Sequence, residues 1–354
     1  MLPRWVKVGV VAAVVLAAVG YLVKPYANDW WLASRVCGGA MPDEAVDKLI
    51  PDGEHLDSDY EYFNEELGVY SCSLIHEDSY RAKGVSALAH TDRDSQDLAM
   101  KTVFYDGTAR SVGALPEGLP GFTDEGRVRL LVSCPDLGKD MEGRPRRLLV
   151  RTSAEREAME GQPDALLRTA VALANQASKK LGCGAEPLKA LKHALPGESK
   201  PVALSALAGT ACSWLAAAKL PTGAGWTVRV AANDAAPVSR CELHRDGEER
   251  PRLVFNAWYG DWSEGPFSEA AARHGSSAAD GWKTRPVLTA NWGRAKARCD
   301  AEAANFEAGA DEDAGIKAPQ LRALLTAFAQ DQVKRHGGCK DLALPTRELP
   351  AAKR

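Results

Sequence analysis

The chain lacks the short motifs that identify many enzymes from sequence. Its 354 residues include no glycine-rich phosphate loop, no HExxH zinc motif, no nucleophile elbow and no CxxC pair. An excess of either charge is also missing, because 44 basic and 47 acidic side chains leave a formal net charge of -3. Without a large basic surface to neutralise phosphates, nucleic acid is not an expected partner.

Clustered metal ligands are missing as well. The seven histidines never occur as a pair within helical reach of a shared metal. Two acidic stretches, residues 54–61 and 311–313, could offer carboxylates to calcium, but they lack the glycine and the ligand spacing of a calcium loop. We expect solvated turns there, and the sequence predicts no metal, no cofactor and no catalytic residue.

One long apolar run stands near the N-terminus. Residues 5–23 read WVKVGVVAAVVLAAVGYLV, and a helix of this length, rising about 1.5 Å per residue, matches a hydrocarbon core of ~30 Å. The basic residues Arg4 and Lys7 at its start favour a cytoplasmic N-terminus. We therefore expect a cytoplasmic tail of residues 1–4 and one transmembrane helix that contacts the lipid bilayer through residues 5–23.

A cleaved signal peptide is the alternative interpretation of this run. Ala18, Val19 and Gly20 are small enough for a signal-peptidase site. Leu22 and Val23 continue the apolar run past that point, which favours a retained anchor. Both interpretations place the rest of the chain outside the cytoplasm, so the predicted localisation is the cell membrane with an extracytoplasmic C-terminal part.

All cysteines follow the apolar run. They are Cys37, Cys72, Cys134, Cys183, Cys212, Cys241, Cys299 and Cys339. An even number of cysteines in an exported chain predicts a disulfide framework. Successive spacings of 35, 62 and 49 residues are followed, after Cys212, by spacings of 29, 58 and 40. The repeated order of spacings predicts two copies of one unit.

Local sequence around the cysteines supports the duplication. The second cysteine of each unit, Cys72 or Cys241, lies in the pattern Val-x-x-Cys-x-Leu. The third follows an arginine by five residues, Arg129 in one unit and Arg294 in the other. The fourth ends an amphipathic helix that is opened by a proline twenty residues upstream. The first cysteine of each unit opens an alanine-rich stretch that ends in a proline after a Lys-Leu pair. Unrelated cysteines in an alanine-rich chain are the alternative, but these four matches in register favour duplication.

The disulfide pairing is narrowed by this symmetry. Eight cysteines allow 105 pairings, and bonds confined to each unit with the same pattern in both leave three. We favour the first cysteine with the second and the third with the fourth, because each such bond joins a helix to a strand.

Each unit is predicted to contain a helix, several strands and a closing helix. Residues 68–76, 98–105, 127–134 and 146–152 have the length and apolar content of strands. Residues 163–183 have apolar side chains at the spacing of one helical face. The fold class is therefore α+β, an antiparallel sheet covered on one side by helices in each unit.

The domain boundaries follow from changes in composition. The first repeat is assigned to residues 24–190 and the second to residues 201–345, with a polar stretch at 189–201 between them and a flexible tail at 346–354. A linker this short implies that the repeats touch. The groove between them is the expected place for a ligand.

Tryptophan is concentrated in the second repeat. Six of the nine tryptophans are there, at positions 214, 226, 258, 262, 282 and 292. Trp258, Tyr259 and Trp262 lie in the sequence NAWYGDW and could form an exposed platform that contacts a ligand or partner. Burial in the core is the favoured alternative, because large rings are usually buried.

The arrangement resembles small actinobacterial envelope domains that are secreted or membrane-anchored and carry paired cysteines. The resemblance rests on the apolar segment, on Cys37 with Cys72, and on Cys212 with Cys241. It implies a binding or structural role at the cell surface without a cofactor. The chain departs from a lipoprotein, since no lipid-accepting cysteine follows the apolar run.

The functional expectation is a membrane-anchored, non-enzymatic binding or interaction module of the cell envelope. An envelope protein or a wall polymer is the expected partner. The alternative is an extracellular hydrolase with its site in the groove between the repeats, which would require an activated nucleophile there.

Overall fold

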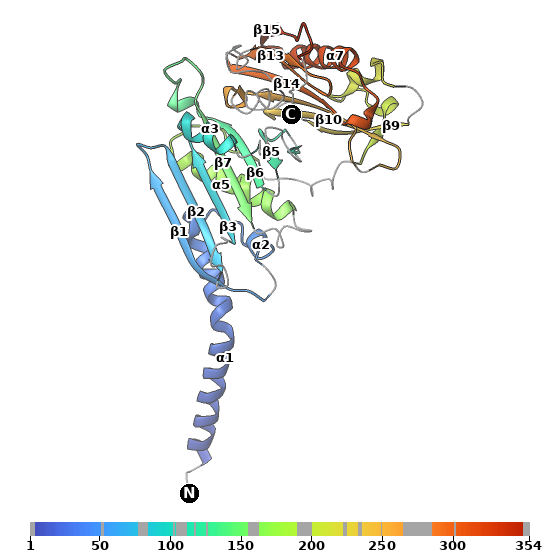
Figure 1. Cartoon of the computed structure of the whole chain (residues 1–354). Coiled ribbons are helices and arrows are strands. Elements are labelled where there is room, and N and C mark those ends of the chain that lie inside the picture. Colours follow the sequence, from blue (N-terminus) through green and yellow to red (C-terminus); the bar gives the residue numbers. More distant parts are fainter. Residues whose placement is uncertain are drawn as a thin grey trace.

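A computed structural model of the chain gives two disulfide-linked α+β units and a long N-terminal helix (Figure 1). The described residues are 4–50, 53–76, 84–101, 103, 112–116, 118–124, 127–154, 163–189, 200–221, 225–232, 236–248, 250–264, 285–300 and 302–349. For residues 4–12 only the backbone is described.

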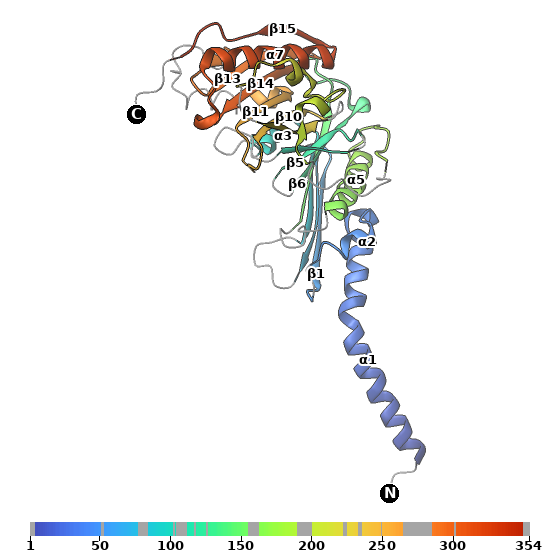
Figure 2. The ribbon, with the colours of Figure 1, turned by 90° about the vertical axis from the view of Figure 1, so that its right-hand side faces the viewer.

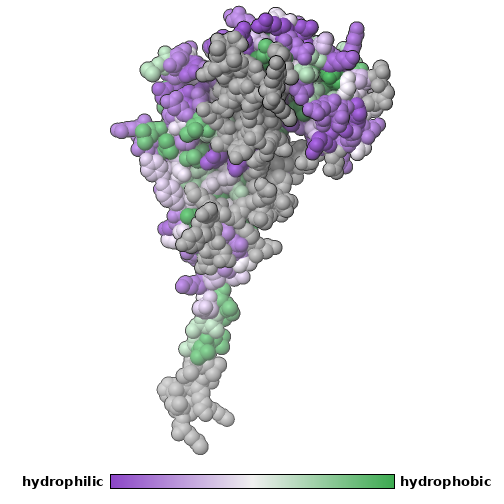
Figure 3. Space-filling model, viewed as in Figure 1, coloured by the Kyte–Doolittle hydropathy of each residue, from purple (hydrophilic) through white to green (hydrophobic). Residues whose placement is uncertain are grey.

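Helix α1 (Arg4–Arg35) extends away from the rest of the molecule, as two perpendicular views show (Figures 1 and 2). Only its last turns pack on the first repeat, where Leu32 and Ala33 are buried and the Asn28 amide donates to the Leu56 carbonyl at 2.9 Å. The described apolar side chains earlier in α1 are exposed, and they form the hydrophobic patch on the stem of the molecule (Figure 3).

The predicted transmembrane helix of residues 5–23 is not confirmed by the structure. Within the described part of the chain, no helix is both long enough and apolar enough to cross a bilayer. The side chains of residues 5–12, the first part of the predicted span, lie outside the described residues.

The first sheet is antiparallel, with strand order β1-β2-β3-β7-β6-β5-β4. Its strands are β1 (Leu56–Asn64), β2 (Val69–His76), β3 (Val85–His90), β4 (Val112–Ala114), β5 (Gly121–Asp124), β6 (Arg127–Ser133) and β7 (Arg147–Ala154). The short helices η1 (Val36–Gly39) and α2 (Asp43–Val46) lie with α5 (Pro163–Lys180) on one face of the sheet (Figure 2). Helix α3 (Arg93–Lys101) and the turn η3 (Pro135–Leu137) lie in the connections between strands.

The second sheet is also antiparallel, with strand order β12-β13-β14-β11-β10-β9-β8 and β15 on β13. Its strands are β8 (Val202–Ala203), β9 (Trp226–Ala232), β10 (Val238–Arg245), β11 (Leu253–Tyr259), β12 (Val287–Leu288), β13 (Trp292–Cys299), β14 (Glu302–Ala310) and β15 (Cys339–Ala343). Helix α7 (Ala318–His336) covers one face. Short turns are η4 (Leu204–Ala206), η5 (Ser213–Ala217), η6 (Asp261–Ser263) and η9 (Glu312–Ala314).

The two sheets are built to one plan. The order β1-β2-β3-β7-β6-β5 in the first corresponds to β9-β10-β11-β14-β13-β12 in the second, with the same succession along the chain. In both, the closing helix packs on the sheet face that carries the half-cystines. Strand side chains alternate between faces, so every second strand residue points into this core. The repeat-like fold predicted from the cysteine spacing is thus confirmed.

Four disulfides are present, and every cysteine is used. They join Cys37 to Cys72, Cys134 to Cys183, Cys212 to Cys241 and Cys299 to Cys339. This is the pattern favoured from the sequence. Disulfides persist in oxidising compartments, so these bonds indicate an extracytoplasmic environment for the folded units.

One of the predicted strands is wrong. Residues 98–105 were expected to be extended, yet Leu98, Ala99 and Met100 belong to helix α3. The Asp92 carboxylate accepts from the Ser95 amide at 2.8 Å and caps the helix start. Short apolar runs do not distinguish a strand from one face of a helix, and here Met100 packs inward while Leu98 is exposed.

The predicted boundaries meet the described structure only in part. Most of the expected linker, residues 190–199, lies outside the described residues, as do residues 350–354 of the expected tail. The start of that tail is attached, because the Leu349 amide donates to the Leu288 carbonyl at 2.7 Å and Arg322 donates to the Thr346 carbonyl at 2.9 Å.

Candidate functional site

The two repeats meet through an apolar cluster that is separate from their own cores. Its buried members are Met100, Val103, Val112, Phe122 and Leu149 from the first repeat, and Ala236, Val238, Trp258, Trp262, Val287 and Trp292 from the second. The contact joins the faces of the two sheets that carry no long helix. Buried apolar area of this kind fixes the relative position of the repeats.

Trp258 and Trp262 do not form the exposed platform considered from sequence. Trp258 is fully buried and Trp262 is 5 % exposed, because both rings fill this interface cluster. Trp258 contacts Phe122 of the other repeat edge to face, at a centroid distance of 6.0 Å, and Trp262 at 5.6 Å. The favoured burial interpretation holds for both, whereas Trp282 lies outside the described residues.

Tyr259 points to the opposite face of β11 and lines an open groove. Its ring stacks on His336 at a centroid distance of 4.3 Å, and its hydroxyl donates to the Gln332 side chain at 3.2 Å. Burial raises the pKa of the Tyr259 hydroxyl, so it stays protonated at neutral pH. Of the three predicted contact residues, Tyr259 alone borders space that a ligand could enter.

A glycine sets the turn that follows Tyr259. Gly260 has φ 133°, and a Cβ there would lie 2.2 Å from the Trp262 indole nitrogen. Only glycine fits both conditions. The turn directs Trp262 into the interface and Asp261 toward the first repeat.

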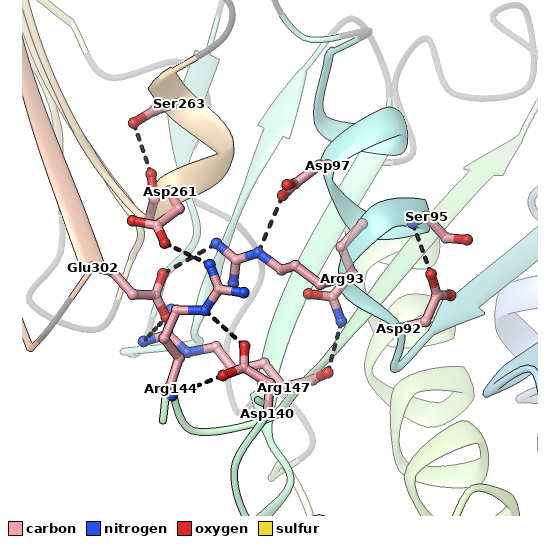
Figure 4. Close-up of polar contacts among 12 residues, drawn as sticks. Asp92, Arg93, Ser95, Asp97, Asp140, Arg144, Arg147, Asp261, Ser263 and Glu302 are labelled. Atoms are coloured by element: carbon pink, nitrogen blue, oxygen red, sulfur yellow. Dashed lines mark hydrogen bonds and ion pairs between the residues drawn. The ribbon is translucent and has the colours of Figure 1, made fainter. Parts of the chain in front are cut away.

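Asp261 belongs to a cluster of charged side chains that bridges the repeats (Figure 4). The Arg144 guanidinium contacts Asp261 at 2.7 Å and Asp140 of its own hairpin at 2.6 Å. Arg93 and Arg147 each lie 3.5 Å from Glu302, which begins β14. Three ion pairs therefore connect the repeats beside the apolar cluster.

The pKa shifts in this cluster show which side chains are stabilised in their charged form. Burial disfavours the Asp261 charge, but hydrogen bonds from Arg144 and from the Ala303 amide outweigh it and lower the Asp261 pKa. The hydrogen bond with Asp261 raises the Arg144 pKa. Burial raises the pKa of Asp97 despite its contact with Arg93 at 3.2 Å. The Arg144–Asp261 pair is thus firmly ionised at neutral pH.

A groove of about 500 Å³ opens beside the charged cluster. Its lining from the first repeat includes Pro120, Leu131, Pro145, Arg147 and Leu188, and from the second Pro237, Tyr259, Glu302 and His336. A second hollow of about 700 Å³ shares Ala236, Tyr259 and His336 with it, so the two form one continuous surface. The groove expected between the repeats therefore exists, with walls that are mainly apolar.

The groove offers limited catalytic chemistry. His336 Nε2 lies 3.4 Å from the Asp300 carboxylate, a pairing that could orient an imidazole. Ser133 lines the same groove, but within the described residues its hydroxyl is not hydrogen-bonded to His336. All thiols are consumed in disulfides. No three His, Cys, Asp or Glu side chains of the described chain are grouped to hold a metal.

Most residues of this site were missed from sequence. Arg93, Arg144, Asp261 and Glu302 are ordinary surface residue types, and their meeting depends on how the repeats dock. The one available signal was NAWYGDW, which contains Asp261 beside the aromatic residues that were singled out. No known family model matches the chain, and no curated protein or solved structure is detectably similar to it.

Proposed function

We propose that this chain is a single-pass protein of the cell envelope, anchored in the membrane through residues 5–23. Its two extracytoplasmic repeats form a non-enzymatic binding unit for an envelope protein or a wall polymer. The inter-repeat groove is the binding site in this proposal.

The groove carries the proposal. A space of about 500 Å³ is within the range of ligand sites in proteins, and it draws its walls from both repeats. The ion pairs beside it are compensated within the protein, as Arg144 with Asp261 shows. Their role is to hold the walls, while the prolines, Leu188 and the stacked Tyr259–His336 pair supply contact area.

Site-specific photocrosslinking in intact cells tests this role. A benzophenone residue at Leu188, inside the groove, should give a discrete adduct that disappears when the groove is filled by Ala185→Trp. The same residue at Met141, which is 97 % exposed and outside the groove, is the matched control. Equal adducts at both positions, or an adduct that persists in the filled variant, would contradict the groove as binding site.

The anchor is supported by the exposure of α1. Val14, Leu16, Val19 and Leu22 are between 51 % and 71 % exposed on a helix that stands clear of the body. Such a concentration of apolar surface is unfavourable in water, and hydrocarbon would remove that cost. The chain should therefore stay with membranes during alkaline extraction.

A charge in the apolar run sharpens that test. Leu16→Arg places a charge in mid-span, which costs about 2.5–3.5 kcal/mol for insertion, and should release the chain from membranes. Ser34→Arg adds the same charge where α1 already meets the first repeat, and should leave the chain bound. Release of the unaltered chain by alkaline extraction would refute the anchor.

The hydrolase alternative keeps one supporting observation, the His336–Asp300 pair in the groove. A hydrolase should lose turnover on His336→Ala while retaining substrate binding. A binding unit should instead lose affinity and show no turnover of any bound compound. Binding and turnover of a crosslinked or co-purified ligand, measured with the unaltered chain and with His336→Ala, distinguish the two functions.

A further inference from the structure

The faces of the two sheets that carry no long helix differ in charge at equivalent positions. In the second sheet a row across four strands reads Arg240, Asn256, Glu307 and Arg294, by direct cross-strand pairing. In the first sheet the same row reads Ser71, Leu88, Arg151 and Arg129. Arg129 and Arg294 correspond, since each lies five residues before the third cysteine of its unit. Arg151 therefore occupies the position of Glu307.

The row in the second sheet is compensated internally. Glu307 accepts hydrogen bonds from the Trp292 indole at 2.6 Å and from the Asn256 amide at 3.0 Å. Arg294 donates to the Asn305 oxygen at 2.6 Å and pairs with Glu264 at 2.9 Å. The buried cations of this face thus have anionic and polar partners within the repeat.

The row in the first sheet places two cations side by side. Arg129 is fully buried, contacts Asp124 and lies over the Phe122 ring at 5.9 Å. Arg151 is directly opposite Arg129 on the next strand. Burial lowers the pKa of Arg129 to about 9, with Arg151 contributing, and burial also lowers the pKa of Arg151, with Arg127 contributing. Within the described chain, no carboxylate contacts the Arg151 guanidinium.

Hydroxyl donors complete this surface. Ser86 and Ser153 lie opposite each other on β3 and β7 with their oxygens 3.0 Å apart, and Arg127 is the next residue of that row on β6. All three are partly exposed, as is Arg151. Guanidinium and hydroxyl groups placed side by side can donate hydrogen bonds to the oxygens of one carboxylate or phosphate group.

We propose that the first repeat binds an oxyanion, a phosphate or carboxylate group, at Arg151 with Arg127, Ser86 and Ser153. The anion brings a negative charge beside Arg151, at the position of the row where the second repeat has a carboxyl group, Glu307, in place of an arginine. This site is distinct from the groove and does not depend on the groove being occupied. Through Arg129 and Phe122, it lies next to the apolar contact with Trp258.

Titration of the full chain in detergent with inorganic phosphate, at constant ionic strength set by chloride, tests the site. We expect saturable binding with one site per chain and a rise in melting temperature as the site fills. Arg151→Glu, which copies the second repeat, should weaken phosphate binding at least about tenfold, because hydrogen bonds to charged groups are lost. The same variant should melt higher than the unaltered chain when no phosphate is present.

Matched variants make the result decisive. Arg146→Glu makes the same charge change at an exposed position five residues before Arg151, just ahead of β7, and should leave phosphate binding unchanged. Arg151→Gln removes the charge with little change in volume. It replaces Arg151→Glu in the phosphate titration if Arg151→Glu does not fold. Absence of saturable phosphate or citrate binding would overturn the proposal, as would equal weakening by Arg146→Glu.

The source of the anion is resolved in a second arm. If the group belongs to a lipid, phosphatidylglycerol added to the micelles should raise the melting temperature without free phosphate, and Arg151→Glu should abolish that rise. If it belongs to a soluble compound, free phosphate alone should produce the effect. No Arg151-dependent change in either arm would overturn the site.

Discussion

The two repeats share an arginine that no longer has the same surroundings. Arg129 and Arg294 are both fully buried at equivalent places in their sheets. Arg294 faces Glu307 across the strands, whereas Arg129 faces Arg151. Backbone geometry and disulfides have therefore stayed matched between the copies while the charges have not, so one duplicated scaffold carries two different electrostatic faces.

That difference predicts unequal losses when each arginine is replaced. Arg294→Met removes the buried guanidinium that pairs with Glu264 at 2.9 Å and donates to Asn305 at 2.6 Å, and breaking such a pair should cost about 3–5 kcal/mol of unfolding free energy. Arg129→Met removes repulsion with Arg151 and leaves Asp124 in contact with Arg127, so its cost should be at least about 1 kcal/mol smaller. Urea unfolding of both variants measures the difference, and equal losses would contradict the comparison.

The disulfides should behave alike in the two repeats. Loops of 49 and 40 residues are closed by Cys134–Cys183 and Cys299–Cys339, and the chain-entropy model gives about 4 kcal/mol for each. Replacing both cysteines of either pair by alanine should lower stability by similar amounts in thermal unfolding. A loss smaller by more than about 1 kcal/mol in the second repeat would show that the hydrogen bonds of β15 to β13 retain that segment without the bond.

Sequence was sufficient for the parts of the fold that depend on spacing. The cysteine intervals and the arginine five residues before each third cysteine indicated the duplication. The length and apolar content of residues 127–134 and 146–152 predicted the strands β6 and β7. The strand prediction for residues 98–105 was wrong because a short apolar run fits a strand or a helix equally. Local periodicity carries no information about helix caps such as Asp92.

The candidate site could be located only coarsely from sequence. A short linker predicted a groove between the repeats, but Arg144 and Asp261 are 117 residues apart and meet only because the apolar faces dock. The burial of Trp258 follows from the same docking, which no single repeat encodes. The correspondence of Arg129 with Arg294 is visible in the sequence, but their different cross-strand neighbours are known only from the strand pairing.

The ion pairs between repeats should give the interface its own pH dependence. The pKa of Asp261 is lowered in the folded chain, so its contribution is present above the usual carboxyl pKa of about 3.9 and is lost as pH falls through the lower folded value. Asp261→Asn should cost about 1–3 kcal/mol at pH 7, and less as pH falls below about 4. Melting curves from pH 7 to pH 3 for both proteins check this, and parallel curves would exclude Asp261 as the cause.

Hydroxyl deletions at equivalent positions test the smallest difference between the repeats. Thr91 and Tyr259 follow the equivalent residues His90 and Trp258, and their hydroxyls donate to Gly68 O and Gln332. Thr91→Val and Tyr259→Phe should each lose about 1 kcal/mol of stability, the net worth of one hydrogen bond. Tyr259→Phe keeps the stack on His336, so groove crosslinking should persist, and only a ligand that contacts the hydroxyl itself would make this variant lose binding out of proportion to its stability.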